Sequence, residues 1–364
     1  MSMRGGLSKV FTETVAKYIV FQFNNPPLVT QAGDYDVHDE VFVQDPKGLI
    51  KVVDELSQLN EEVVAIDGSS RSFFFSQGVV SVSSVVAFSN TRGALLTFPS
   101  FGGMKGLDQD IPFISIATPF TNVDRIEDFV LPPSVSKFST QQLNINDQNA
   151  LETELRFSLE TACIERLKDK QFVLIDGPLI PRFIYLNKKI SQKLIERRKS
   201  TLNRNLVGIV KRVNRSSILV NAMRKDDNYF YSTYGINPHS FSSDEALLTH
   251  LARKIQRTPN RPFIVGPVIR KQEELEITSH YVVVPFHPFV EKFSILRIES
   301  ISNSFLPETL LSIPMSFDGI PLPLALADKL AKEISSAVFS LLIQDLQQMG
   351  MQASFYSRLE GLGL

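Results

Sequence analysis

The sequence is poor in cysteine and has no excess of charge of either sign. Its 364 residues include one cysteine, Cys163, which excludes a framework of internal disulfides and fits a reducing compartment. Lysine and arginine number 38 and aspartate and glutamate 39, giving a net charge of −1. Any nucleic-acid site must therefore be a local basic patch.

Long apolar runs and nucleotide-binding loops are also missing. No stretch is apolar for long enough to cross a bilayer, and no basic-then-apolar leader is found, so we expect a cytoplasmic protein without a membrane partner. The glycine-rich segment 101–106 lacks the spacing of a P-loop and its Lys-Ser/Thr pair, so we assign it no nucleotide role. The remaining composition, 43% hydrophobic and 21% charged, is that of an ordinary globular protein.

Two short apolar runs end in Asp-Gly. Residues 63–68 are VVAIDG and residues 172–177 are FVLIDG, and each predicts a buried strand that ends in a carboxylate, Asp67 or Asp176. Asp-Gly after a strand is also ordinary turn chemistry. Two copies favour neighbouring strands whose carboxylates meet, which is an arrangement that holds divalent cations because hard ions prefer oxygen ligands.

Two helices supply further acids. The apolar spacing of residues 151–167 predicts a helix on which Glu160 shares a largely apolar face. Glu152 and Glu154 are expected in its first turn, where acidic side chains interact favourably with the helix dipole. A last long helix is predicted to about residue 348, and Asp328 borders its buried stripe beside small residues. Glu160 is the preferred helix ligand, with Glu154 as the alternative.

The middle third of the chain is locally basic. A predicted helix over 187–204 and the segment after it carry most of the positive charge. A charge run is usually a solvated surface, but beside a carboxylate cluster a track for the phosphate backbone is the better interpretation. We assign DNA contacts to Arg71, Lys193, Arg197, Arg198, Lys211, Arg212 and Arg215.

The sequence predicts a main domain with a separate segment at each end. Helical spacing over residues 7–21 and 49–59 predicts an amphipathic N-terminal helical arm, residues 1–60. Residues 61–348 form the main domain, an α/β fold with inserted elements, and residues 349–364 are a C-terminal tail.

The order of these motifs resembles the ribonuclease-H-like architecture, a mixed sheet flanked by helices. It is more similar to one branch, the NurA family of archaeal and bacterial nucleases. The matching segments, which together cover about residues 60–345, are 65–69 (AIDGS), 155–160 (LRFSLE), 174–179 (LIDGPL), 207–211 (VGIVK), 296–299 (LRIE), 319–324 (GIPLPL) and 327–328 (AD).

The resemblance implies a metal-dependent DNA nuclease. Four acids would hold two Mn²⁺ or Mg²⁺ ions, and Lys211 would stabilise charge on the phosphate. The four are Asp67, Glu160, Asp176 and Asp328. The family further implies 5′–3′ exonuclease and single-strand endonuclease activity, a homodimer, and a HerA-type hexameric ATPase as partner in resecting DNA ends for double-strand-break repair.

Two positions depart from the family pattern. Ile320 stands where the family usually has tyrosine, and Asp328 stands where it usually has histidine. Aspartate still suits Mn²⁺ or Mg²⁺, but the missing hydroxyl removes a group that could touch substrate. A weakened or inactive paralogue that acts as a DNA-binding scaffold is therefore a second hypothesis. A small-molecule phosphohydrolase is a third, which would not need the basic segment.

Overall fold

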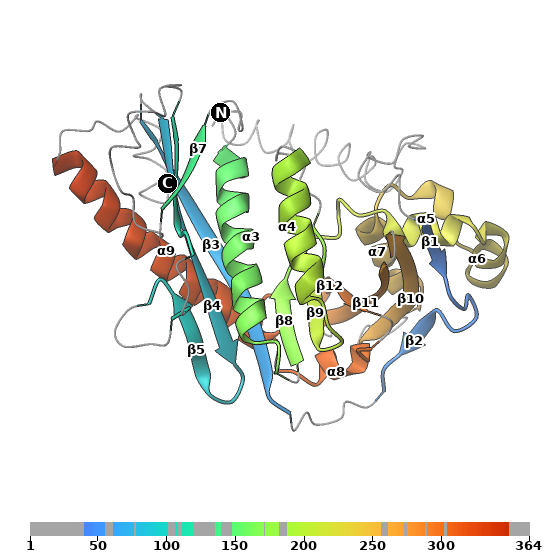
Figure 1. Cartoon of the computed structure of the whole chain (residues 1–364). Helices are drawn as coiled ribbons and strands as arrows, with labels where there is room; N and C mark the ends of the chain where they lie inside the picture. Colours follow the sequence, from blue (N-terminus) through green and yellow to red (C-terminus); the bar gives the residue numbers. More distant parts are fainter. Residues whose placement is uncertain are drawn as a thin grey trace, which may run out of the picture. The chain divides into compact units, whose positions relative to one another are not determined.

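The computed structural model describes residues 40–54, 61–75, 78–100, 106–107, 111–118, 135–139, 148–170, 172–181, 188–255, 261–272, 275–287, 290–301 and 304–348. The chain divides into two compact units (Figure 1). Unit 1 combines residues 1–54 with 212–297, and unit 2 combines residues 55–211 with 298–364. Each unit is therefore built from segments that are far apart in the sequence.

Unit 2 contains a mixed β-sheet in the order β9-β8-β3-β4-β6-β7, with β5 also paired to β4. Strands β3 and β8 run parallel, as do β8 and β9, whereas β3 and β4 run antiparallel. The bounds are β3 Val63–Phe75, β4 Gly78–Ser89, β5 Gly93–Phe98, β6 Ile114–Thr118, β7 Val135–Ser139, β8 Phe172–Asp176 and β9 Leu206–Val210. This arrangement confirms the expected mixed α/β fold.

Helices cover both faces of this sheet (Figure 1). The long helices are α3 (Gln148–Arg166), α4 (Lys188–Thr201) and α9 (Leu322–Gln348), and α8 (Pro307–Leu311) is short. Successive side chains of a strand point to opposite faces, and on β3 the Ser69 hydroxyl meets Ser335 of α9 while the Ser70 hydroxyl donates to a carbonyl of α3. Helices α3 and α9 thus pack on opposite sides of β3.

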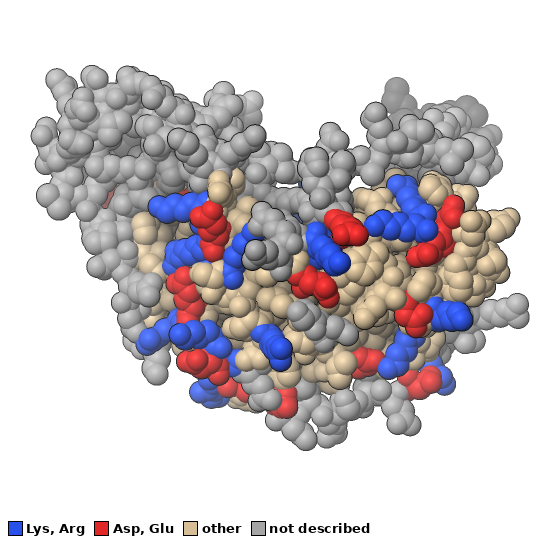
Figure 2. Space-filling model, turned by 45° about the vertical axis from the view of Figure 1, so that its right-hand side comes forward, with Lys and Arg blue, Asp and Glu red and all other residues tan. Residues whose placement is uncertain are grey.

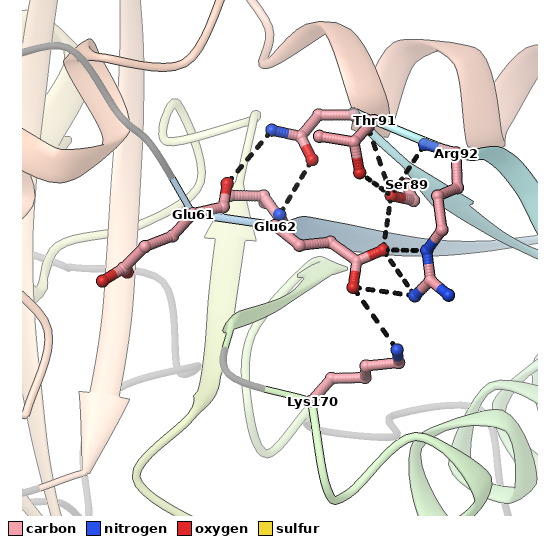
Figure 3. A network of polar contacts seen from close by, with 8 residues as sticks. Glu61, Glu62, Ser89, Thr91, Arg92 and Lys170 are labelled. Carbon is pink, nitrogen blue, oxygen red and sulfur yellow. Dashed lines mark hydrogen bonds and ion pairs between the residues drawn. The ribbon is translucent and has the colours of Figure 1, made fainter.

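A network of hydrogen bonds and ion pairs surrounds Glu62, the residue before β3 (Figure 3). The Glu62 carboxylate accepts two bonds from the Arg92 guanidinium at 2.7 Å, one from Ser89 at 2.7 Å and one from Lys170 at 3.3 Å. Burial raises the pKa of Glu62, but these hydrogen bonds outweigh burial and hold the pKa below its ordinary value. This end of β3 is therefore occupied by a carboxylate whose partners are all supplied by the protein.

Unit 1 is a second α/β unit. Strands β1 and β2 both pair antiparallel with β10, which pairs antiparallel with β11. Strand β12 begins in unit 1 and continues into unit 2. The bounds are β1 Glu40–Val43, β2 Ile50–Val52, β10 Phe263–Gln272, β11 Leu275–His287, β12 Val290–Ile301, α5 Ile218–Arg224, α6 Asp227–Tyr234, η3 Pro238–Ser240 and α7 Asp244–Ile255.

One local prediction was wrong, and one segment departs from its local propensity. Residues 50–52 form strand β2 instead of a helix, because β10 offers ladder partners that the helical spacing could not reveal. Residues 218–224 form helix α5, although Ile218 and Val220 favour a strand. The buried Asp244 carboxylate accepts the Val220 amide in the first turn and so stabilises the helix.

The expected N-terminal arm is thus not all helical, since its described part, residues 40–54, carries β1 and β2. These strands belong with residues 212–297, so the chain divides after residues 54, 211 and 297. The helix expected over 7–21 and the tail 349–364 lie outside the described residues. Among the helices that the structure describes, none is long and apolar enough to span a membrane.

Candidate metal and nucleic-acid site

Strands β3 and β8 bring Asp67 and Asp176 together. The two strands are parallel, and Ile66 pairs with Ile175. Asp67 and Asp176 are the next residues of the two strands, so they are neighbours across the sheet. The runs before them are apolar and buried, which fixes the register of the strands. Asp67 is only 3% exposed. The sequence predicted that the two carboxylates are neighbours, but β3 continues to Phe75, so Asp67 lies within its strand and not at the end, whereas β8 does end at Asp176.

Lys211 lies between these carboxylates. It follows strand β9, the parallel neighbour of β8. Its Nζ atom is 3.1 Å from Asp176 Oδ1 and 3.6 Å from Asp67 Oδ2. Burial lowers the pKa of Lys211, but the charges of Asp176 and Asp67 outweigh burial and raise it above its ordinary value. Lys211 is therefore a charged bridge between the two aspartates.

Glu160 of α3 approaches this pair across Gly68. A Cβ atom at residue 68 would lie 2.9 Å from Glu160 Oε1 and 2.7 Å from Arg156 Cγ, too close for any side chain. The glycine of the first Asp-Gly motif is thus required for the packing of α3 on β3. The charge of Glu160 also contributes to the raised pKa of Asp67. Glu160 is accordingly the helix acid of this cluster.

Glu154 has a different environment. Helix α3 begins at Gln148, so Glu152 and Glu154 do not lie in its first turn as the sequence suggested. Burial raises the pKa of Glu154 to about 7, which the Ser158 hydroxyl and the Lys193 charge only partly oppose. Glu154 is not among the charges that shift the pKa of Asp67, which favours Glu160 over Glu154 as the ligand.

Arg198 is a buried partner of Glu160. Its side chain is 1% exposed, so the prediction that it contacts DNA was wrong. One guanidinium nitrogen is 3.6 Å from Glu160 Oε2, Nε donates to Thr161 Oγ1 at 2.9 Å, and the guanidinium lies 4.1 Å from the centre of the Phe157 ring. No local pattern in the sequence indicates this burial, because it arises where α4 packs on α3.

Burial and the neighbouring charged side chains shift the pKa of Asp67. Burial raises its pKa most, and the Asp176 charge raises it further, while Lys211 opposes both. Glu160 and Asp328 add smaller contributions in the raising direction, so the pKa lies well above its ordinary value. Among the residues that the structure describes, Asp67 Oδ2 has no hydrogen-bond partner. A buried oxygen of this kind is costly unless a cation binds it.

Asp328 lies at the edge of the cluster. It pairs within α9 with Lys332, whose Nζ is 2.7 Å from Asp328 Oδ2. Its charge nevertheless contributes to the shifted pKa values of Asp67 and Lys211. Helix α9 is held on β3 by the bond from Ser335 to Ser69. The fourth predicted acid is thus near the other three, but it is turned toward its own lysine.

Sequence reasoning missed the contribution of Glu299. This fully buried acid on β12 accepts the Leu179 amide at 2.9 Å and so holds the loop that follows Asp176. A Cβ at Gly208 would clash with the backbone of the same loop, at 2.9 Å from the Gly177 carbonyl oxygen. The available signal was a lone glutamate at the end of an apolar strand motif, residues 296–299.

The remaining residues proposed for DNA contact are dispersed. Arg71 is partly buried on β3, Lys193 is exposed on α4, and Arg197 makes two hydrogen bonds to Glu165. Arg212 and Arg215 are exposed and belong to unit 1. On the face shown in Figure 2, basic and acidic side chains are interspersed and do not form one basic patch.

The cluster suits a divalent cation by its chemistry. It offers carboxylate oxygens, the ligands that Mg²⁺ and Mn²⁺ prefer, and one of them is buried without a hydrogen bond. Within the described ranges, however, no three His, Cys, Asp or Glu side chains are already arranged to hold a metal ion. Metal binding here would require side chains to move.

Comparisons with known proteins agree with this geometry. A family model described as the NurA domain matches residues 61–333. The crystal structure of the NurA nuclease from Sulfolobus solfataricus is similar, with a TM-score of 0.52 and 12% identity over 96% of this chain and 98% of that chain. At this identity the similarity concerns the fold alone.

Two further structures are more distant. One, NurA with manganese, has a TM-score of 0.33 and 13% identity over 92% of this chain and 98% of that chain. The other, NurA bound to dAMP and manganese, has a TM-score of 0.31 and 13% identity over 88% and 93% of the two chains. A comparison with curated proteins found no match. Since the family model spans most of the sequence, including β3, α3, β8 and the part of α9 that carries Asp328, the chain belongs to the NurA family.

Proposed function

We propose that this protein is a divalent-metal-dependent deoxyribonuclease that hydrolyses phosphodiester bonds. The observation that supports this most is the meeting of Asp67 and Asp176 with Glu160 nearby, in which Asp67 Oδ2 is buried without a hydrogen bond. Membership of the NurA family, and the fold shared with a structure named as the NurA nuclease, point to the same chemistry.

The four acids Asp67, Glu160, Asp176 and Asp328 would hold a two-ion site for Mn²⁺ or Mg²⁺. Such ions supply an acidified water for attack and neutralise charge on the leaving oxygen. The chain itself contributes orientation and charge. Arg156 and Arg198 flank the Glu160 carboxylate, at 3.8 and 3.6 Å, and limit how it can turn. Lys211 would donate its N–H groups to a phosphate oxygen.

The substrate and partners follow from the family. We propose that DNA is bound through Arg71, Lys193, Arg197, Lys211, Arg212 and Arg215, that the protein forms a homodimer, and that a HerA-type hexameric ATPase is its partner in resecting DNA ends. We further propose 5′–3′ exonuclease and single-strand endonuclease activity, which the resemblance to the family implies. We also propose a cytoplasmic location, which the single cysteine of the sequence fits.

One observation favours the alternative, an inactive paralogue that serves as a DNA-binding scaffold. The Lys332 ammonium donates to Asp328 Oδ2 at 2.7 Å, so one oxygen of this carboxylate is already engaged. Ile320, where the family has tyrosine, offers no side-chain hydroxyl. A scaffold would keep DNA binding and would show no metal-dependent cleavage.

The test is cleavage of end-labelled single- and double-stranded DNA in Mn²⁺, Mg²⁺ or EDTA. We expect degradation with metal only, and a loss of roughly 1,000-fold or more in Asp67→Asn and Asp176→Asn, as is typical when a group that stabilises the transition state is removed. Asp169→Asn, which changes an exposed acid of unit 2, is the matched control and should cleave normally. Intact DNA in every lane with binding preserved, also in the presence of the ATPase, would support the scaffold instead.

A further inference from the structure

Every acid of the cluster has a cation beside it in the metal-free chain. Lys211 serves Asp67 and Asp176, and the i,i+4 pair of Lys332 and Asp328 lies on α9. Arg156 and Arg198 lie 3.8 and 3.6 Å from the Glu160 oxygens. Four carboxylates therefore face four cations. If a divalent ion bound while all four cations stayed in place, it would add two positive charges to a site whose charges already cancel.

The four cations differ in how firmly they are held. Arg198 is fully buried, hydrogen-bonded to Thr161 and stacked over Phe157, so it is fixed in place. The side chains of Arg156 and Lys332 are about half or more exposed, and each contacts one acid only. Lys211 differs from all three because it contacts two acids, which come from two strands, and its side chain is 21% exposed. A lysine on a four-carbon stem with an open side can swing out.

Lys211 also occupies the position that a bridging ion would need. Its ammonium lies within 3.1 and 3.6 Å of oxygens from the two aspartates that end the paired runs of β3 and β8. Among the described residues, no three His, Cys, Asp or Glu side chains are already placed to hold a metal ion, so side chains must move when one binds. The ammonium and a divalent ion would compete for the same oxygens.

We propose that Lys211 is the resident counter-cation of the metal-free site, which a divalent ion displaces, and that its release makes the ammonium available to a DNA phosphate. Metal occupancy and phosphate binding are then coupled through one side chain. The inference rests on the proposed function, because it takes Asp67 and Asp176 to be metal ligands. It also predicts the direction of an effect that the proposed function alone does not predict: removal of Lys211 increases the affinity for the metal.

The experiment is a calorimetric titration of the full chain with Mn²⁺, without DNA, together with thermal melting in EDTA and in Mn²⁺. Lys211→Met keeps an unbranched side chain that is one atom shorter and removes the charge. We expect it to bind Mn²⁺ roughly tenfold or more tightly than the parent, since a unit charge in direct contact is removed. We also expect a lower Tm in EDTA and a larger rise in Tm on adding Mn²⁺. Lys211→Arg, which keeps the charge, should stay near the parent affinity.

Lys332→Met is the matched control, because it removes one lysine at the edge of the cluster without touching Asp67 or Asp176. Its gain in Mn²⁺ affinity should be clearly smaller. Equal gains in both variants, or an unchanged or weaker affinity in Lys211→Met, would overturn the inference. Should Lys211→Met fail to fold, Lys211→Gln is titrated in its place and read in the same way.

These results separate the inference from the proposed function. Parent protein that binds Mn²⁺ and loses binding in Asp67→Asn supports the metal site, whatever Lys211→Met does. Parent protein that binds no Mn²⁺, or binds it equally well in Asp67→Asn, would overturn the site and with it both proposals.

Discussion

Each unit of the chain buries an aspartate, and the two aspartates differ in what surrounds them. In unit 1, the fully buried Asp244 accepts hydrogen bonds from Ser216 at 2.6 Å, from Tyr281 at 2.7 Å and from the Val220 amide at 3.1 Å. In unit 2, Asp67 is 3% exposed, and its Oδ2 atom has no hydrogen bond from the part of the chain that the structure describes. Both are costly to bury, but only one is satisfied by the protein.

The neighbours of the two aspartates explain the contrast. Burial raises the pKa of Asp244, and the Ser216, Tyr281 and Val220 hydrogen bonds, with the Arg297 charge, oppose that rise. Burial also raises the pKa of Asp67, but there the largest neighbouring charge, that of Asp176, adds to the rise. A buried carboxylate surrounded by donors stabilises a fold, whereas one surrounded by other carboxylates is suited to a cation. The comparison therefore separates an aspartate whose hydrogen bonds are supplied by the protein from one that could still bind a cation.

The largest effect on stability is expected at Asp244. Asp244→Ala leaves the Ser216 and Tyr281 hydroxyls and the Val220 amide without their acceptor, and Arg297 loses a nearby negative charge. We expect the free energy of unfolding to fall by about 3–5 kcal/mol, as for other broken buried networks. Urea denaturation measures this directly. A loss below about 1 kcal/mol would mean that the network carries little of the stability of unit 1.

A smaller effect of opposite sign is expected at Asp67 in EDTA. Asp67→Asn removes the repulsion from Asp176 and Glu160, although it also removes the contact with Lys211. At pH 8 we expect the variant to be more stable than the parent by on the order of 1 kcal/mol. Asp67→Asn should therefore lose activity while it gains stability, whereas Asp244→Ala should lose stability.

The pH dependence of this difference has a defined sign. Folding raises the pKa of Asp67, so the folded chain holds that proton more tightly than the unfolded chain. Its contribution to stability is complete below the unfolded pKa, near 3.9, and is lost as the pH rises through the higher folded pKa. In EDTA the advantage of Asp67→Asn should shrink as the pH falls from 8 toward 4. A difference that grows toward acid pH would contradict this account of Asp67.

The central strands of unit 2 could be predicted because local pattern and tertiary structure agree there. Four apolar residues before each Asp-Gly predict a buried strand, and parallel pairing then brings Asp67 beside Asp176. Glu160 could be preferred over Glu154 because its helix neighbours are apolar. In each case the information lies within one turn or one strand of the residue concerned.

The rest depended on contacts between distant segments. Arg198 resembles its neighbour Arg197 in sequence, yet one is buried against Glu160 and the other pairs with the partly exposed Glu165. Residues 40–54 join strand β10, more than 200 positions later, which no local spacing predicts. Glu299 supports the loop after Asp176 from 120 positions away. Tertiary packing decided these positions, and local propensity did not.

The most direct test of the central claim is the anomalous scattering of Mn²⁺ in crystals of the full chain. We predict an anomalous peak bonded to carboxylate oxygens of Asp67 and Asp176, and no peak at Asp244, whose oxygens are already occupied by protein donors. The Lys211 ammonium should have moved away from the two aspartates in the same crystals. Crystals grown at a Mn²⁺ concentration that supports DNA cleavage, but without a peak at Asp67, would contradict the claim that this carboxylate is a metal ligand.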